Sequence, residues 1–262
     1  MSAMMKKGVL LATVLVATTW LHAGDKDKPA PKLETKVVDS GSFGIYADGK
    51  RIGTETFKIE QRPDFSIATA EIKVDDGTTK ATQTSEMQVA PNGELHSYIW
   101  RGVVPAKEES TVEPKEDMLT EHIVDADLKK HNVPHLLPLS TAILDDNFFS
   151  HREILLWRYL TTGCHPRQDK QLECAPSQFG ILVPRQHQAE NVTMELAGTE
   201  KTTVKGAVRE LNKVILKIAD PAQLVVMNQK ESEPGQWVLW VDDNYRVIKI
   251  TVTGTNIEVV RD

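Results

Sequence analysis

Short apolar runs with a period of two, separated by turn signals, occupy residues 36–262 and constrain the fold more than any other feature of the chain. Phe43 and Ile45 alternate with small or polar residues, and turn signals follow at residues 48–49 and 91–93. Alternation places one side of each strand in a core, and Gly, Asn and Asp favour tight hairpins. The pattern predicts a mainly β fold, in which about a dozen strands form a curved antiparallel sheet or half-barrel as a single domain.

The alternation of apolar residues changes phase within one of the expected strands. Phe65 and Ile67 are odd-numbered, whereas the next apolar residues, Ala68, Ala70 and Ile72, are even-numbered. A phase change within a strand is typical of a β-bulge, which bends a sheet.

A single stretch breaks the strand pattern and predicts a helix over about residues 146–161. Asp145, Asp146 and Asn147 are candidates for its N-cap, and Gly163 is expected to end it. At helical spacing its apolar residues share one arc, which we expect to pack into the concave face of the curved sheet. The residues of this arc are Phe148, Phe149, Leu155, Leu156, Tyr159 and Leu160.

Arg152 lies near the middle of the apolar arc, and its position has two interpretations. In the first, its stem covers apolar surface while the guanidinium reaches water or a structural carboxylate. In the second, the guanidinium binds the acidic head of an amphiphile inside a cavity. The second interpretation makes Arg152, Phe148, Phe149 and Tyr159 the candidate ligand-binding residues.

The N-terminal segment predicts where the protein works. Lys6 and Lys7 precede an apolar run over residues 8–20, as in a secretory signal peptide that ends near residue 23. Residues 24–35 are charged, contain two prolines and are expected to form a flexible linker. The mature protein is therefore predicted to be periplasmic or secreted.

Composition narrows the classes of partner. The net charge of the whole chain is −6, and no basic stripe with interleaved aromatic residues is present, so we expect no nucleic-acid partner. No later apolar run approaches the roughly 20 residues that span a bilayer, so the protein is not expected to span a membrane after signal cleavage.

Cys164 and Cys174 are the chain's two cysteines, and both lie in one polar segment after the expected helix. In an oxidising compartment, thiols ten residues apart are expected to form a disulfide that holds this loop. The alternative is a reactive thiol assisted by His165. Neighbours in sequence seldom form a catalytic dyad, however, because the base must reach the sulfur through space.

The remaining candidates for chemistry predict no catalytic residue, metal site or cofactor. His131 and His135 are four residues apart, but Pro134 between them excludes the helix on which such a spacing makes a zinc site. The chain contains neither a glycine-rich phosphate loop nor a G-x-S-x-G motif. Trp237 and Trp240 are expected on opposite faces of one strand, one in the core and the other either in the core or a platform for a sugar or lipid.

Three stretches together resemble a family of secreted bacterial β-rich proteins that is grouped as a domain of unknown function. They are residues 46–59 (YADGKRIGTETFKI), 143–159 (ILDDNFFSHREILLWRY) and 240–250 (WVDDNYRVIKI). The resemblance implies a curved antiparallel sheet that wraps a helix, similar in outline to the half-barrel of periplasmic lipoprotein carriers. It implies no catalytic residue, and the Cys164–Cys174 loop has no place in its pattern.

These observations lead to one functional hypothesis and two alternatives. The first is a non-enzymatic secreted or periplasmic protein that binds an apolar or amphiphilic ligand, such as a lipid, in a half-barrel. The second is an envelope accessory protein whose apolar groove binds a segment of a partner protein. A hydrolase is the third. A deep pocket favours the first, an open edge favours the second, and a convergent cluster of His, Asp and Glu favours the third.

Overall fold

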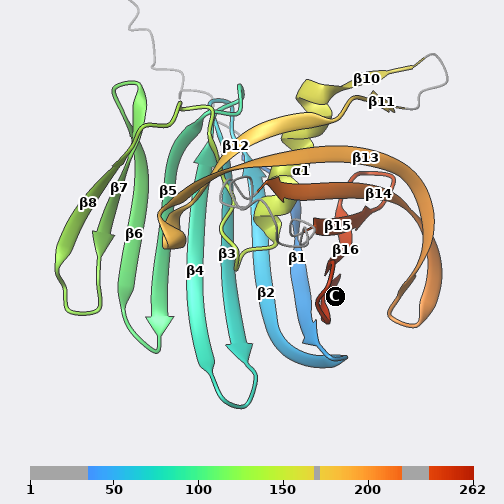
Figure 1. Cartoon of the computed structure of the whole chain (residues 1–262), viewed down its shortest axis with the longest axis horizontal. Helices are drawn as coiled ribbons and strands as arrows, with labels where there is room; N and C mark the ends of the chain where they lie inside the picture. Colours follow the sequence, from blue (N-terminus) through green and yellow to red (C-terminus); the bar gives the residue numbers. More distant parts are fainter. Residues whose placement is uncertain (1–34, 168–171, 220–235) are drawn as a thin grey trace, which may run out of the picture. The chain divides into compact units, whose positions relative to one another are not determined.

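The computed structural model describes residues 35–167, 172–219 and 236–262. The predicted signal peptide and nearly all of the predicted linker lie outside these residues. Strands dominate the described residues, and they surround one α-helix (Figure 1). Residues Glu34–Asp262 form one compact unit.

The first eight strands form an up-and-down meander in which each strand pairs with the next. Turn residues with positive φ, such as Asp48 and Gly49, connect them. The strands are β1 (Lys36–Ala47), β2 (Lys50–Gln61), β3 (Ser66–Asp75), β4 (Lys80–Val89), β5 (Leu95–Val104), β6 (Glu108–Lys115), β7 (Met118–Val124) and β8 (Lys130–His135).

The second half contains the helix and the strands that return around it. After β9 (Ala142–Ile143) come α1 (Ser150–Gly163) and the hairpin of β10 (Cys164–Pro166) and β11 (Leu172–Cys174). The chain continues through β12 (Ser177–Val183), the 3-10 helix η1 (Pro184–Gln186), β13 (Gln188–Val204), β14 (Ala207–Ala219), β15 (Gln236–Val241), β16 (Val247–Val252) and β17 (Ile257–Arg261).

Pairing of the first strand with the last joins the two halves into one sheet. In the antiparallel β1–β17 ladder, Ile45 lies opposite Val259. The order of this sheet is β8-β7-β6-β5-β4-β3-β2-β1-β17-β16-β15-β14-β13-β12-β9, and only its β9–β12 pair is parallel. Because β8 and β9 are the two ends, the sheet curls around the helix without closing. The predicted mainly β half-barrel around one helix is confirmed, with more strands than the expected dozen.

The β-bulge predicted in β3 is absent, because β3 pairs with both β2 and β4 without a register shift. The phase change instead reflects apolar residues on both faces of the strand. Ala68, Ala70 and Ile72 belong to the main core, whereas Ile67 is buried outside it. Register shifts occur in other ladders, such as β1–β2, between Val37 and Asp39 and between Ile45 and Tyr46.

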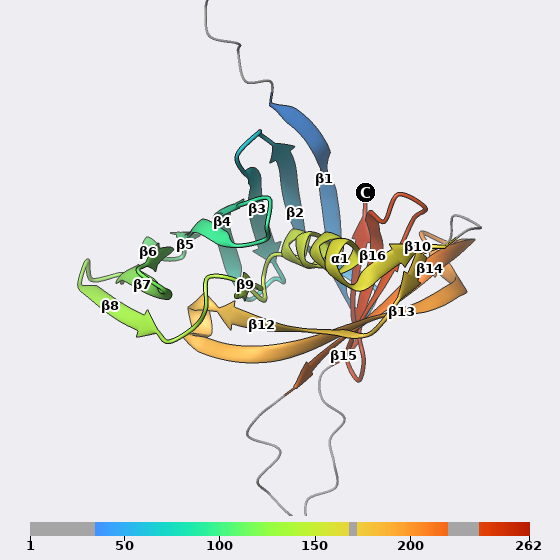
Figure 2. The same cartoon turned by 90° about the horizontal axis from the view of Figure 1, so that it is seen from above.

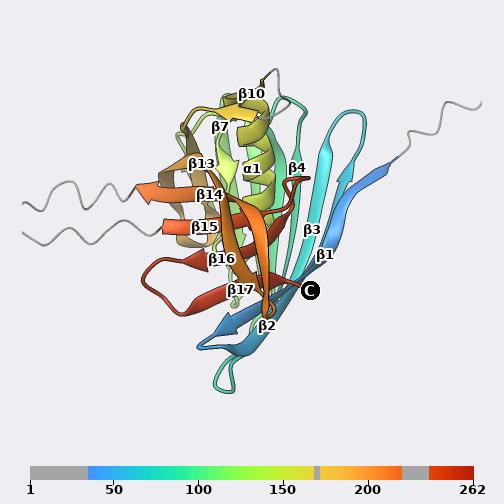
Figure 3. The ribbon, with the colours of Figure 1, turned by 90° about the vertical axis from the view of Figure 1, so that its right-hand side faces the viewer.

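The helix lies between β1–β5 and the returning strands β12–β16 (Figures 2 and 3). Contacts are made on several of its sides. His151 contacts Ser85 of β4, Trp157 Nε1 donates to the carbonyl of Tyr245, and the Tyr159 hydroxyl accepts a hydrogen bond from the amide of Leu196. An enclosed helix of this kind buries more than one face.

The helix begins at Ser150, four residues later than predicted, and it ends at Gly163. No side chain from the preceding loop caps it. Instead, the buried carboxylate of Glu55 on β2 accepts hydrogen bonds from the amides of Phe149 (2.6 Å) and Ser150 (3.1 Å). Asp145, a predicted cap, holds the loop before the helix, because it accepts from the Tyr98 hydroxyl. The cap therefore comes from a distant strand.

A second, smaller core covers the opposite face of the sheet. Val204 and Leu211, near the end of the β13–β14 hairpin, pack with Val238, Trp240, Ile248 and Val260. Trp237 packs against the main core instead, so the two tryptophans face opposite sides of β15 as expected. Trp240 is 9% exposed, which agrees with a core position rather than an open platform.

Among the described residues, the structure contains no helix that is both long and apolar enough to cross a bilayer.

Candidate functional site

A cavity of about 370 Å³ lies between α1 and the inner face of β1–β5. Its walls are mostly apolar, because the inward residues of a curved sheet face one side of the helix here. The apolar lining includes Ile59, Ala68, Met87, Leu95, Ile143 and Leu155. The volume lies near the lower limit of small-molecule pockets, which span roughly 300–1,000 Å³.

One part of the cavity wall is polar and comes from three segments of the chain. Arg158 contributes from α1, Thr141 from the segment that precedes β9, and Gly93 from the turn between β4 and β5. Thr141 Oγ1 and Arg158 Nε are buried and have no hydrogen-bond partner within the described residues. Two unsatisfied polar atoms thus belong to residues that line one apolar cavity.

The guanidinium of Arg158 is held in place from several directions. Its Nη1 donates to the carbonyl of Ser140 at 2.8 Å, and its Cζ lies 5.5 Å from the centre of the Phe179 ring. Gly93 has a φ of +83°, and a Cβ there would lie 3.1 Å from Nε, so glycine serves both the turn and the close approach. Burial lowers the pKa of Arg158, and the nearby Glu94 opposes this shift.

The cavity lining contains few groups suited to acid–base chemistry. Among the described residues that line it there is no Asp, Glu, Lys or Cys. His151 is the one lining histidine, and burial together with the neighbouring Arg152 lowers its pKa to about 3. Its Nδ1 accepts from the amide of Asp145 (3.3 Å), so Nε2 carries the proton toward Ser85 Oγ (3.3 Å). In that tautomer His151 cannot take a proton from Ser85, as a serine nucleophile requires.

The four residues predicted to bind a ligand lie elsewhere on the helix and its entry. Phe148, Phe149, Arg152 and Tyr159 are all buried, but none of them lines the cavity. The structure brings Phe149 and Arg152 together near Trp237, where the Phe149 and Trp237 ring centres are 6.3 Å apart. The Phe148 ring instead stacks on His151, with ring centres 5.4 Å apart. A role for these four residues in ligand binding stays a prediction.

Arg152 reaches neither of the groups expected of a structural arginine. Its side chain is 0% exposed, and no carboxylate of the described residues lies within ion-pair distance. Its Cζ is 3.8 Å from the centre of the Trp237 ring, and Nη1 donates to the carbonyl of Phe148 at 3.1 Å. Burial lowers the pKa of Arg152 to about 10, and Asp146 and Glu55 act in the opposite direction. Stacking on the aromatic ring of Trp237 compensates part of the free energy lost when the guanidinium is removed from water.

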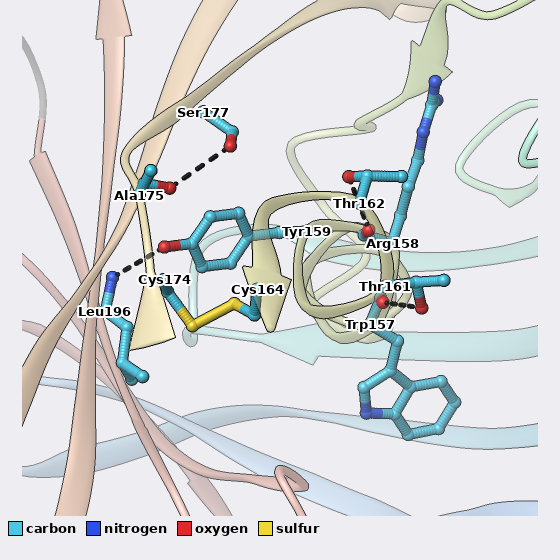
Figure 4. Close-up of a disulfide and its surroundings, with 10 residues drawn as sticks. All are labelled: Trp157, Arg158, Tyr159, Thr161, Thr162, Cys164, Cys174, Ala175, Ser177 and Leu196. Atoms are coloured by element: carbon cyan, nitrogen blue, oxygen red, sulfur yellow. Dashed lines mark hydrogen bonds between the residues drawn. A yellow bond between two sulfur atoms is a disulfide. The ribbon is translucent and has the colours of Figure 1, made fainter. Parts of the chain in front are cut away.

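Cys164 and Cys174 form the predicted disulfide, with their sulfur atoms 2.08 Å apart. The two residues are directly opposite each other in the β10–β11 hairpin, which follows the helix. Figure 4 shows Tyr159 pointing toward the disulfide and Leu196, whereas Arg158 and Trp157 leave the helix on other sides. The disulfide therefore lies on the Tyr159 side of α1, away from Arg158.

Sequence reasoning missed the buried carboxylate of Glu121 and its contacts with two histidines, which lie outside the cavity. Glu121 accepts from Ser110 Oγ at 2.6 Å, and it also contacts His135 Nε2 (3.0 Å) and His187 Nδ1 (2.9 Å). His131 instead contacts Asp125, so the two histidines considered for zinc have different partners. Within the described ranges no group of three or more His, Cys, Asp or Glu residues can hold a metal ion. Alternation marks inward positions but does not indicate which acids and histidines meet across a sheet.

Comparisons with known proteins show the fold and no more. No family model matches the chain, and a search of curated proteins found no match. Among solved structures, a beta-barrel-like protein of domain of unknown function DUF1849 from Brucella abortus aligns with a TM-score of 0.50 and 7% sequence identity. The alignment covers 87% of this chain and 97% of that chain. The chain therefore has the fold of a β-rich, barrel-like domain of unknown function, and this similarity does not extend to secretion or to lipoprotein carriers.

Proposed function

We propose that this protein binds an apolar or amphiphilic ligand, without chemical conversion, in the cavity between α1 and β1–β5. The single observation that carries the proposal is the mostly apolar cavity of about 370 Å³. A concave, mostly apolar pocket that includes a few polar groups is the usual position of a small-molecule site in a protein.

Two further features support binding rather than hydrolysis. The described lining residues include no carboxylate or thiol that could act as a nucleophile or general base. The lining histidine has a pKa lowered to about 3, far below the range of an effective general base near neutral pH. A periplasmic or secreted location, proposed from the N-terminal sequence, suits a carrier of apolar molecules between membranes.

The proposal is tested with the neutral fluorescent probe N-phenyl-1-naphthylamine and a variant that fills the cavity. Ser66 lines the cavity at the start of β3, so Ser66→Trp places an indole in the binding space. Thr69→Trp is the matched control, because Thr69 lies on the same strand but does not line the cavity. We expect saturable fluorescence enhancement with the wild type and the control, and affinity at least about tenfold lower with Ser66→Trp.

Absence of saturable probe binding to the folded wild type would contradict the proposal, as would equal binding by both variants. Circular dichroism of each variant verifies that the fold is retained. If the probe does not bind, the alternative of a groove that receives a partner segment becomes the better account of the cavity.

A further inference from the structure

We propose that Arg158 and Thr141 form a head-group subsite, which selects single-chain amphiphiles with a carboxylate head, of the fatty-acid class. This inference rests on the proposed function, since it concerns the same cavity. It assigns the polar recognition to Arg158 rather than to Arg152.

The first argument is that both residues have an unused donor. Thr141 is 2% exposed and its Oγ1 has no partner within the described residues, and the same holds for the buried Nε of Arg158. Leaving a buried donor unpaired is costly, so native proteins rarely retain one without a ligand or water to satisfy it. Arg152 Nε and Nη2 are also unpaired, but Arg152 does not line the cavity. A carboxylate oxygen accepts from both an N–H and an O–H.

The second argument is that a hydrogen bond holds Arg158 against the segment that carries Thr141. The carbonyl that accepts from Arg158 Nη1 belongs to Ser140, the residue directly before Thr141. This hydrogen bond anchors Nη1 of the guanidinium, while Nε, next to the Gly93 turn, has no hydrogen-bond partner within the described residues. The backbone of Thr141 is itself fixed, because its amide donates to the carbonyl of Pro138 at 2.9 Å. The subsite is therefore preorganised before a ligand binds.

The third argument concerns charge. The described residues that line the cavity include one arginine and no acidic residue, so the lining carries a positive charge. Glu94 opposes the lowering of the pKa of Arg158, but the two side chains form no ion pair within the described residues. No acidic lining residue neutralises the charge of Arg158, so an anionic head group would do so. A cationic head group would be repelled.

The fourth argument concerns size. A cavity of about 370 Å³ is close to the lower limit for small-molecule sites, which favours one hydrocarbon chain over two. The apolar wall formed by Met87, Leu95, Ile143 and Leu155 suits that chain. Together these features fit a single-chain carboxylate better than a diacyl phospholipid.

The test compares three amphiphiles that share a twelve-carbon chain and differ only in the head group. Dodecanoate, dodecanol and dodecyltrimethylammonium are titrated, below their micelle concentrations and at pH 8, against protein loaded with N-phenyl-1-naphthylamine. We expect dodecanoate to displace the probe at a concentration about tenfold or more lower than dodecanol, as expected for a hydrogen bond to a charged group. The cationic amphiphile should be weakest.

Variants then assign the preference to residues. Arg158→Met should abolish the advantage of dodecanoate over dodecanol while dodecanol itself binds as before. Thr141→Val removes little more than the hydroxyl, so it provides a second test if Arg158→Met does not fold, and it should reduce the advantage several-fold. Arg101→Met is the control, because Arg101 pairs with Glu109 on the surface and does not line the cavity.

Each other outcome overturns a defined part of the argument. Equal binding of dodecanoate and dodecanol to the wild type would overturn the head-group subsite while leaving the proposed function intact. Loss of the preference in Arg152→Met but not in Arg158→Met would move the subsite to Arg152. Failure of the probe and all three amphiphiles to bind would overturn the proposed function itself.

Discussion

At the scale of single residues, buried carboxyl groups distinguish this protein. Glu55, Glu121 and Glu153 are each 0% exposed, although a buried carboxylate is costly unless it is neutralised or hydrogen-bonded. Burial raises the pKa of Glu55 to about 7. Burial and the neighbouring Asp39 raise the pKa of Glu153 to about 9. Glu153 is therefore protonated at neutral pH.

The raised pKa of Glu153 predicts a pH-dependent stability. Because its pKa is higher in the folded state than the ordinary value of 4.5, its contribution is complete below about pH 4.5 and is lost as pH rises toward 9. The free energy of unfolding, measured with urea between pH 5 and 9, should therefore decrease with pH in the wild type. Glu55 acts in the same direction up to about pH 7.

Glu153→Gln should flatten this decrease while retaining stability near pH 5. A glutamine is close in shape to a protonated glutamate, and its carbonyl can accept from the Val247 amide, as Glu153 Oε2 does at 3.1 Å. Parallel pH profiles for the wild type and the variant would show that Glu153 titrates with an ordinary pKa.

At the scale of elements, the start of α1 depends on a residue 94 positions earlier in the chain. Glu55 on β2 accepts from the amides of Phe149 and Ser150, which are among the helix donors that lack intrahelical partners. A cap from a neighbouring strand fixes the helix against the sheet as well as satisfying its first turn. It also fixes the position from which Arg158, two turns later, reaches the cavity.

Glu55→Ala should destabilise the protein by about 3 kcal/mol, because it leaves two buried amides unsatisfied. Asn147→Ala, at a cap position expected from the sequence, should cost about 1 kcal/mol, since its side chain donates only to Gln83. Urea unfolding monitored by circular dichroism measures both values. A larger loss of stability in Asn147→Ala than in Glu55→Ala would show that the loop before the helix, rather than Glu55, caps α1.

At the scale of the whole molecule, the segment around η1, which follows β12, meets the β5–β7 part of the meander without pairing as strands. We call their side-chain contacts the seam. In the seam, Arg185 Cζ lies 5.1 Å from the centre of the Trp100 ring, Gln186 donates to Asp146, and His187 contacts Glu121. Residues from η1 and its end thereby bind side chains of β5 and β7 and of the loop before α1. Polar contacts replace the backbone ladder that a closed barrel would have.

Glu121→Gln should weaken the seam. The carboxylate contacts His135 and His187 through one oxygen and accepts from Ser110 through the other, and an amide cannot accept at both positions. We expect a loss of about 2 kcal/mol in the free energy of unfolding, with faster amide hydrogen exchange in β7, β8 and residues 184–187.

The matched control for the seam is Glu109→Gln, which removes an exposed charge paired with Arg101 and should change stability by less than about 1 kcal/mol. Uniform exchange over the molecule in Glu121→Gln, with no increase confined to the seam, would show that Glu121 acts in general packing rather than in joining the η1 segment to the meander.

The sequence by itself determined the local features of this protein. Period-two alternation and turn residues such as Gly49 and Gly93 predicted the meander, because both depend only on neighbours along the chain. The same locality explains why the helix and the Cys164–Cys174 disulfide were found. Even there the helix start was placed four residues early, since its cap is not local.

Tertiary structure alone decided which side of the helix faces a cavity. The apolar arc drew attention to Arg152, but a helix enclosed by a sheet is buried on several sides, so hydrophobicity cannot distinguish a packed face from a lining face. Arg152 packs on Trp237, whereas Arg158, which no sequence pattern marked, lines the cavity with Thr141. These contacts join segments far apart in the sequence, and they exist only once the sheet has curled around the helix.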